Sequence, residues 1–317
     1  MRRIKIISLA VLCVFGLSLQ ASSTRITYKS AKSSSSYYQM AVQVGENINH
    51  ITHGKLSVTI EESQGSVQNV KEARKRTGNY VFTTPPVLIK LAQAKKAMFK
   101  NDNPKSYDKI RALFPIPFLT MHFVVRADSG INTFADLAGK SILIGKGSFG
   151  AKEAAKYIKL FGLAGKVKLI NAELSGAVAA LKNGQIDGFA TSGSYPAPNV
   201  IEAAASTKIK ILSMTPQEIK LTKRDPLVIP AGTYPNINHD IMTTTLPVGV
   251  YTTTNMSEKT AYELTKAFWE SKKNLEKQNI WWKAITFKNL NMFHTKLHKG
   301  ALKYYEEVKA NLPARLK

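Results

Sequence analysis

Apolar and polar residues alternate along this chain in blocks that predict strands and helices in turn. Short apolar runs over Arg25–Lys29, Leu56–Glu61 and Tyr80–Thr83 have the length and residue types of strands, and each leads into a polar turn and then a helical pattern. Because the unit of strand, polar loop and helix repeats, the pattern indicates an α/β fold with a mainly parallel sheet.

The same alternation continues through the middle of the chain. Strands are predicted over Met121–Arg126, Ser141–Ile144 and Val167–Ile170, and a glycine-rich loop over Gly145–Gly150 opens a helix after the second of them. The segment Leu174–Ala205 then predicts a helix, an Asn-Gly turn, a short strand, a Gly/Ser/Tyr/Pro loop and another helix. Such a segment suits the holding of a small molecule better than its cleavage.

The last third of the chain is predicted to be mainly helical. A Pro/Gly-rich segment over Pro226–Pro235 is interpreted as a crossing between lobes, Thr243–Thr252 as a strand, and Ser257–Lys277 as one helix with Ser257 as its N-cap. We expect two α/β lobes with the chain crossing near residues 120 and 245. Lobe I then comprises residues 22–120 and 246–317, and lobe II comprises residues 121–245.

The first residues indicate export. Arg2, Arg3 and Lys5 precede an apolar run over Ile6–Leu19, and small residues follow, as in a signal peptide cleaved near Ala21. The run is shorter than the roughly 20 residues of a membrane span, although an uncleaved anchor is the alternative. The sequence therefore predicts a signal peptide over residues 1–21 and a mature protein in the periplasm, which we expect to be a soluble monomer.

Charge and cysteine content limit the partners and the kinds of catalysis that we expect. The formal net charge is +24, and such a surface attracts anions. Arg74-Lys75-Arg76 is the one tight basic triplet and no recognition motif accompanies it, so nucleic acid is not the expected partner. A basic protein that merely adheres to anionic surfaces remains an alternative. The single cysteine, Cys13, lies in the predicted signal peptide, which excludes thiol catalysis and disulfides in the mature chain.

Hydroxyl-bearing residues gather in five loops at the predicted carboxyl ends of strands, where ligands bind in open α/β sheets. Each helix that begins there adds about half a positive charge, which suits a carboxylate. The candidate ligand-binding residues are Ser35, Ser36, Tyr37, Tyr38, Ser66, Asn69, Thr83, Thr84, Lys146, Ser148, Ser192 and Tyr195.

An enzyme is the alternative class. Gly145–Gly150 matches G-x-G-x-x-G after a strand, and Glu173 follows at the end of the next strand, as in a dinucleotide-binding enzyme. His294 and His298 have the spacing of zinc ligands but lack the glutamate of a hydrolase motif. No nucleophile elbow is present. We therefore expect no catalysis, no metal and no cofactor.

Several long stretches resemble one family of transport proteins. They are GSVQN from Gly65, VVRADSGINTFADLAGK from Val124, SGAVAALKNGQIDGFATSGSYPAP from Ser175, IPAGTYP from Ile229, and the helix over Met256–Trp269. Together they resemble the TAXI family of solute receptors of TRAP (tripartite ATP-independent periplasmic) transporters, over nearly all of the mature chain.

The resemblance implies a type II periplasmic-binding-protein fold that closes by a hinge motion on a small organic anion, a carboxylate or an amino-acid-like compound, and delivers it to a TRAP permease. Two ligand-facing motifs depart from the family pattern. Ser34–Tyr38 reads Ser-Ser-Ser-Tyr-Tyr where Gly-Gly-Thr-Tyr-Tyr is usual, and Thr83–Pro86 replaces a Gln-Ser-Asp type of sequence. The family's ligands are therefore not transferred to this chain.

Overall fold

The structure, a computed structural model, describes residues 23–317. In this part of the chain, helices cover a mixed sheet of ten strands. The predicted signal peptide lies outside these residues. The strands are β1 (Thr24–Lys29), β2 (Leu56–Glu61), β3 (Tyr80–Thr84), β4 (Ile110–Arg126), β5 (Ser141–Leu143), β6 (Lys168–Ile170), β7 (Gly188–Gly193), β8 (Ile209–Ile211), β9 (Asp225–Ile229) and β10 (Ile241–Thr253). The α-helices are α1 (Ser36–Ile51), α2 (Ser66–Glu72), α3 (Pro86–Gln93), α4 (Phe149–Leu160), α5 (Ala177–Lys182), α6 (Pro198–Ser206), α7 (Pro216–Thr222), α8 (Glu258–Glu270), α9 (Lys272–Gln278) and α10 (Lys299–Glu307).

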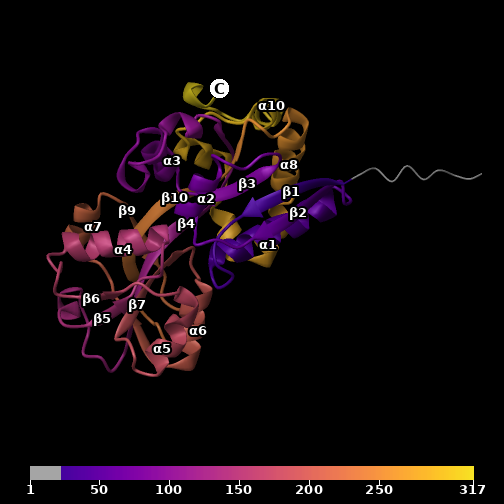
Figure 1. Ribbon diagram of the computed structural model, residues 1–317. Helices are drawn as coiled ribbons and strands as arrows, with labels where there is room; N and C mark the ends of the chain where they lie inside the picture. The colour runs from indigo at the N-terminus through magenta and orange to yellow at the C-terminus, as the bar shows by residue number, and fades with distance from the viewer. Residues whose placement is uncertain (1–22) are drawn as a thin grey trace, which may run out of the picture.

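The elements form two α/β lobes (Figure 1). The first lobe holds β1 to β3 with α1 to α3 and the C-terminal helices α8 to α10, and the second lobe holds β5 to β8 with α4 to α6. The sheet order is β2-β1-β3-β10-β4-β7-β5-β6, with β8 also paired to β4 and β9 to β10. The long strands β4 and β10 stand at the centre of this order and join the lobes.

The sheet is less parallel than the sequence predicts. Parallel pairs lie at its two ends, where β1 pairs with β2 and β3 and β5 pairs with β6 and β7. Every named strand that pairs with β4 or β10 runs antiparallel to it. The strand-loop-helix units thus predict the ends of the sheet correctly, but the two connecting strands run against their neighbours.

The long central strand β4 extends well beyond the strand that the sequence predicts, because prolines in it argue against a strand. The sequence predicts a strand over Met121–Arg126, whereas β4 begins at Ile110 and contains Pro115 and Pro117. Proline cannot donate to a sheet ladder, so such residues argue against a central strand. The ladder between β4 and β10 accommodates prolines with register shifts, one of which spans Pro247 between Leu246 and Val248.

Two further elements differ from the prediction. The segment interpreted as a crossing at Pro226–Pro235 is in part strand β9, which pairs with β10. The helix predicted over Ser257–Lys277 is two helices, because α8 ends at Glu270 and α9 begins at Lys272. Ser257 is confirmed as the N-cap of α8, where its side chain accepts a hydrogen bond from the backbone N–H of Thr260.

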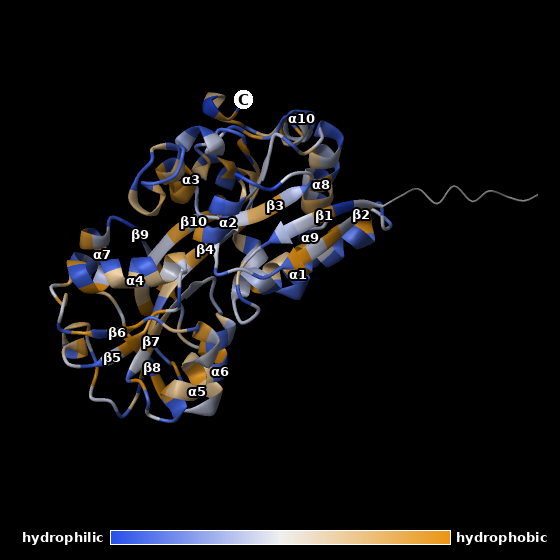
Figure 2. Ribbon diagram, in the orientation of Figure 1, coloured by the Kyte–Doolittle hydropathy of each residue, from blue (hydrophilic) through white to orange (hydrophobic). Residues whose placement is uncertain are grey.

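Hydrophobic residues concentrate on the strands and on the inward faces of the helices that cover them (Figure 2). The larger core cluster fills the first lobe and continues beneath α4 through Phe149, Ala154 and Tyr157. A smaller cluster lies between β7 and the helices α5 and α6. Within residues 23–317, no helix combines the length and the hydrophobicity that crossing a membrane would require.

Candidate functional site

A cavity of about 90 Å³ lies between the two lobes at the carboxyl ends of five strands. After β1, the first lobe contributes Ala31, Lys32, Ser34, Ser35 and Tyr37, and after β2 it contributes residues 64–66. The second lobe contributes the glycine loop after β5, residues 173–174 after β6 and the end of β7. Leu119 of the connecting strand β4 completes the wall. This is the position at which open α/β sheets bind ligands.

Half of the residues predicted from the sequence line this cavity. They are Ser35, Tyr37, Ser66, Lys146, Ser148 and Ser192. The other half lie outside its lining, namely Ser36, Tyr38, Asn69, Thr83, Thr84 and Tyr195. Direct contact of any of these residues with a ligand stays a prediction.

Three of the outlying residues are buried in the first lobe. Asn69 is fully buried, and its Nδ2 donates to the carbonyl oxygens of Ser30 at 2.6 Å and Thr83 at 2.9 Å. The Thr83 hydroxyl lies 2.9 Å from that of Tyr28. Thr84 is also fully buried, and its hydroxyl donates to the carbonyl of Pro85. The side chains of Asn69 and Thr83 connect the ends of β1 and β3, whereas the bond of Thr84 is local.

The remaining three occupy positions around the start of α1 and the end of β7. Ser36 is buried, and its Oγ accepts a hydrogen bond of 3.0 Å from the backbone N–H of Ser194, which belongs to the other lobe. The backbone N–H of Tyr38 donates to Ser35 Oγ at 3.2 Å. Tyr195 packs against the smaller core cluster. Ser36 therefore helps to hold the lobes against each other.

The N-termini of two helices, one from each lobe, meet at the cavity. Ser35 caps α1 and Ser148 caps α4, and each side chain accepts a hydrogen bond from a backbone N–H in the first turn. The glycine loop reaches α4 through Gly145 and Gly147, whose φ angles of 79° and 69° favour glycine. The partial positive charges of both helix termini thus face the same small space.

The third glycine of the motif permits close packing of α4 on β7. A Cβ atom at Gly150 would lie 2.0 Å from Ser192 Oγ and 2.8 Å from Ser192 Cβ, so only glycine fits there. Ser192 is itself a cavity residue. The G-x-G-x-x-G pattern is accounted for by this packing and by the turn that precedes it.

Sequence reasoning missed a contact that joins the lobes across the cavity. Lys32 Nζ lies 3.5 Å from Glu173 Oε2, and Gln64 Nε2 donates to Glu173 Oε1 at 3.3 Å. In the sequence, Glu173 stands out only as part of the dinucleotide pattern, and no motif marks Lys32 or Gln64 as a site residue. The position of Glu173 after a predicted strand is the one sequence feature that could have indicated this contact.

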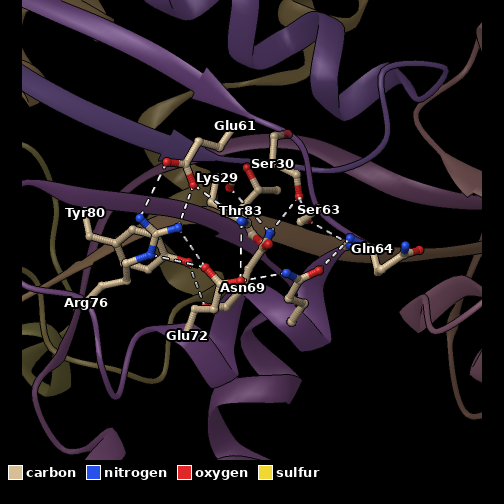
Figure 3. Close-up of polar contacts among 12 residues, drawn as sticks. Lys29, Ser30, Glu61, Ser63, Gln64, Asn69, Glu72, Arg76, Tyr80 and Thr83 are labelled. Carbon is tan, nitrogen blue, oxygen red and sulfur yellow. Dashed lines mark hydrogen bonds and ion pairs between the residues drawn. The ribbon is translucent and has the colours of Figure 1, made fainter.

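A polar network fixes the loop that carries Gln64 (Figure 3). Ser63 Oγ accepts from the backbone N–H of Gly65 at 2.9 Å and donates to the carbonyl of Ser30 at 3.0 Å. The backbone N–H of Gln64 donates to Gln68 Oε1 at 2.8 Å, and Gln68 in turn donates to Glu72 at 2.6 Å. The loop therefore presents its cavity residues from a fixed position.

Behind this loop, two basic and two acidic side chains alternate. Lys29 lies 3.4 Å from both Glu61 and Glu72, and Arg76 lies 2.6 Å and 3.0 Å from the same two carboxylates. Burial opposes ionisation of Glu72, but the hydrogen bonds from Gln68 and Arg76 and the charge of Lys29 hold its pKa below the ordinary value. The four charges compensate one another, so the network is structural.

The charged side chains that line the cavity are Lys32, Lys146 and Glu173. Because Lys32 and Glu173 pair, Lys146 leaves the cavity with a net positive charge. Burial raises the pKa of Tyr37 well above its ordinary value, so its phenol stays neutral and donates to the carbonyl of Pro117 at 3.2 Å. The arrangement places hydroxyl groups, two helix N-termini and a lysine around one small space.

One of the two histidines that have the spacing of zinc ligands has a structural role. His298 caps α10, with Nδ1 accepting from the backbone N–H of Gly300. Its Nε2 lies 3.1 Å from the carbonyl of Met256. Within residues 23–317, no three His, Cys, Asp or Glu side chains form a group that could hold a metal ion.

Two lobes joined by long strands, with a cavity at facing strand ends, define the type II periplasmic-binding-protein fold. A solved structure described as a periplasmic transporter shares this fold at a TM-score of 0.54 and 12% identity, over 90% of this chain and 92% of that one. The chain belongs to the NMT1-like family, whose sequence profile matches residues 29–308.

Other solved structures are similar at lower scores. Holo ArgBP from T. maritima matches with a TM-score of 0.47 and 13% identity, over 78% of this chain and 91% of that one. The periplasmic aliphatic sulphonate binding protein SsuA from Escherichia coli matches with a TM-score of 0.45 and 13% identity, over 90% and 79%.

Proposed function

We propose that this protein is an extracytoplasmic solute receptor that captures a small organic anion between its lobes and delivers it to a membrane permease. The observation that carries the proposal is the cavity at facing strand ends, where α1 and α4 of opposite lobes direct their N-termini at one space. Backbone N–H groups and the helix dipoles favour an anion there. The family and the fold support a binding protein.

The proposed direct contacts are the cavity-lining members of the predicted set, with Ser35, Ser66, Ser148 and Ser192 donating hydrogen bonds and Lys146 adding charge. Tyr37 forms part of the wall. Ser36, Asn69 and the other outlying residues position these contacts rather than touch the ligand.

The proposed motion is a hinge closure of residues 22–120 and 246–317 against residues 121–245. The two crossing points support it, because Thr120 of β4 and Thr245 of β10 are direct partners in the antiparallel ladder. Two adjacent strands that bend at one level allow the lobes to rotate without breaking their cores. The contacts of Glu173 with Lys32 and Gln64 belong to the closed state of this motion.

The proposed partner is a TRAP permease, and the proposed location is the periplasm after removal of the signal peptide. The long stretches that resemble TAXI receptors support this partner. A dinucleotide-binding enzyme is disfavoured, because the three glycines of the motif are accounted for by the turn before α4 and by the packing of α4 on β7. Glu173 is also engaged by Lys32 instead of facing a ribose.

The test begins with protein purified without its first 21 residues. Mass spectrometry of the extracted protein identifies any co-purified anion, and a thermal-shift screen covers carboxylates, sulfonates and amino acids. A ligand at 100 times its dissociation constant stabilises the folded state by about 2.7 kcal/mol, which such a screen detects. A protein with no co-purified solute and no stabilising compound in the screen would contradict the receptor function.

The partner needs its own assay. Proteoliposomes that contain the small and large TRAP membrane subunits should accumulate the identified solute only when this receptor is present. Uptake that is independent of the receptor would refute the TRAP assignment while leaving the binding function intact.

A further inference from the structure

The turn over residues 194–197 follows β7 of the second lobe but is bonded to the first lobe. The backbone N–H of Ser194 donates to Ser36 Oγ at 3.0 Å, and the Ser194 hydroxyl donates to a carbonyl of β4 at 2.7 Å. The indole Nε1–H of Trp281 donates to the carbonyl of Pro196 at 3.2 Å. Ser36, Ser194 and Trp281 are all buried. Three enclosed hydrogen bonds therefore join the lobes at this turn.

Trp281 is held in the first lobe by its neighbours in the chain. The adjacent Trp282 is fully buried, and its Nε1–H donates to Gln43 Oε1 of α1 at 2.8 Å. Gln278, the last residue of α9, accepts from Asn47 of the same helix at 3.0 Å. The segment that carries Trp281 is thus bonded to α1, whose first residue also binds the turn. Both contacts with the turn come from one rigid frame.

The peptide group that accepts from Trp281 is bonded to the second lobe on its other side. The N–H of Ala197 donates to Tyr234 Oη at 2.9 Å, and Tyr234 Oη lies 2.8 Å from His122 Nε2. His122 Nδ1 lies 3.2 Å from the carbonyl of Thr120, which only accepts, so Nδ1 carries the hydrogen of the neutral ring and Nε2 accepts from Tyr234. A buried chain of hydrogen bonds therefore runs from Trp281 through the turn to Thr120.

The turn begins at the level where β4 and β10 join the lobes. Gly193, the last residue of β7, pairs with Thr120 of β4, and Thr120 pairs with Thr245 of β10. When one lobe rotates on the other, an atom moves in proportion to its distance from the axis. Contacts beside these strands are therefore displaced little.

The contacts across the cavity lie farther from those strands. Gln64 follows β2 and Glu173 follows β6, which are the two end strands of the sheet order, whereas β4 and β10 are central. We call the edge formed by Lys32, Gln64 and Glu173 the mouth of the cavity. The side chains of Lys32 and Glu173 are 35% and 44% exposed, so little packing opposes their separation.

A third connection restricts how the lobes can move. Adjacent strands lie about 4.8 Å apart, and a ribbon of two strands twists as well as bends. The turn continues from β7, which lies on the opposite side of β4 from β10. Its bonds to the first lobe therefore oppose twisting and leave a bending motion that returns Glu173 to the same partners.

We infer that Trp281 and the turn over residues 194–197 form a third connection between the lobes, which persists while the mouth of the cavity opens. This inference rests on the proposed hinge motion and adds a fixed contact to it. Trp281 is a positioning residue, because it holds the turn and thereby the end of β7 that carries the cavity residue Ser192.

Engineered cysteine pairs can report on both contacts, because the protein without its first 21 residues has no cysteine of its own. A Cβ built at Gly193 lies 3.7 Å from Ser36 Cβ, and one built at Gly147 lies 3.7 Å from Gln64 Cβ. Both separations match the roughly 3.5–4.5 Å between the Cβ atoms of a disulfide. Ser36→Cys with Gly193→Cys is the hinge pair, and Gln64→Cys with Gly147→Cys is the mouth pair.

The rate of disulfide formation with oxidised glutathione is measured by mass spectrometry in ligand-stripped protein, with and without Glu173→Lys. This substitution places a positive charge beside Lys32 and so drives the mouth open. We expect the mouth pair to react at least fivefold more slowly in the Glu173→Lys background and the hinge pair to change less than twofold. An added positive charge favours the reactive thiolate, so slower reaction reports separation. Any strain from the positive φ at Gly147 is present in both backgrounds and cancels.

Trp281→Phe tests the positioning role, because it keeps a ring and removes the N–H donor. The hinge pair should react at least threefold more slowly in this background, and the Ser194 amide should exchange hydrogen at least tenfold faster. Trp269→Phe is the matched control, since it removes a 3.0 Å bond from an indole N–H to Tyr305 within the first lobe. Trp269→Phe should leave both rates unchanged. Unchanged rates in Trp281→Phe would overturn the role given to Trp281.

The other outcomes separate this inference from the hinge motion on which it rests. Equal slowing of both pairs by Glu173→Lys, or a hinge pair that does not oxidise, would show that the turn leaves the first lobe. If neither pair slows, the result counts against the hinge motion. The Ser194 amide then decides the third connection, because exchange within tenfold of an unstructured peptide would overturn it and protection of at least 100-fold would support it.

Discussion

The contact between Lys32 and Glu173 should bias the protein toward closure by a small, measurable free energy. The two groups lie 3.5 Å apart, but their side chains are 35% and 44% exposed, so solvent and salt weaken the attraction. Exposed ion pairs of this kind contribute about 0.2–1 kcal/mol. If the unliganded protein is mainly open, losing the pair raises the ligand dissociation constant by roughly 1.4- to 5-fold.

A double-mutant cycle isolates the free energy of the contact between Lys32 and Glu173. The identified solute is titrated into the wild-type protein, Lys32→Gln, Glu173→Gln and the double variant. The four dissociation constants give a coupling free energy that excludes the direct effect of each charge on the ligand. We expect about 0.2–1 kcal/mol at low ionic strength, falling toward zero in about 0.5 M salt. A coupling energy of zero at low salt, or one that salt does not reduce, would refute the reasoning.

Three other perturbations follow from the packing. Gly150→Ala places a Cβ 2.0 Å from Ser192 Oγ, and overpacking of about 1–3 kcal/mol should outweigh a helix-propensity gain of about 1 kcal/mol. Weaker ligand binding and a lower Tm are therefore expected, and an unchanged dissociation constant would contradict the contact. Glu153→Gln breaks a bidentate bond to Arg224, with both distances 2.9 Å, and should cost about 3–5 kcal/mol in urea denaturation. A cost below about 1 kcal/mol would show that the buried charge finds another partner. Burial lowers the pKa of His122 from 6.5 to about 4. Between these values the unfolded chain binds a proton that the folded chain does not, so stability falls as the pH drops through this window. His122→Asn should flatten that part of the profile, and an equally steep loss in the variant would assign the effect to other groups.

Local sequence patterns predict most of the elements because local forces decide them. The strands over Leu56–Glu61 and at Thr24–Lys29 match their predicted runs within a residue, since alternating and β-branched residues favour extended backbone. The cap of α8 at Ser257 needs only a hydroxyl near its own first turn. The glycine loop before α4 follows from the positive φ angles that glycine adopts.

Long-range pairing lies beyond such patterns. Strand β4 continues through Pro115 and Pro117 because β10 pairs with it and register shifts accommodate the irregularity, and the local signal at these prolines indicates a break. The antiparallel centre of the sheet has the same origin. A strand that returns from the other lobe takes the direction that the crossing imposes, and no run of residues encodes that direction.

At the cavity, local sequence and tertiary structure determine different features. The sequence by itself determined that serine-rich and glycine-rich loops follow the strands, and it predicted a ligand-binding edge there. Only the tertiary structure decided that Ser35 faces the cavity while its neighbour Ser36 binds the backbone of Ser194 in the opposite lobe. It also decided that Glu173 meets Lys32, because this contact forms only when the folded lobes face each other. Neighbouring side chains at a helix start point in different directions, and which of them meets a ligand depends on where the other lobe packs.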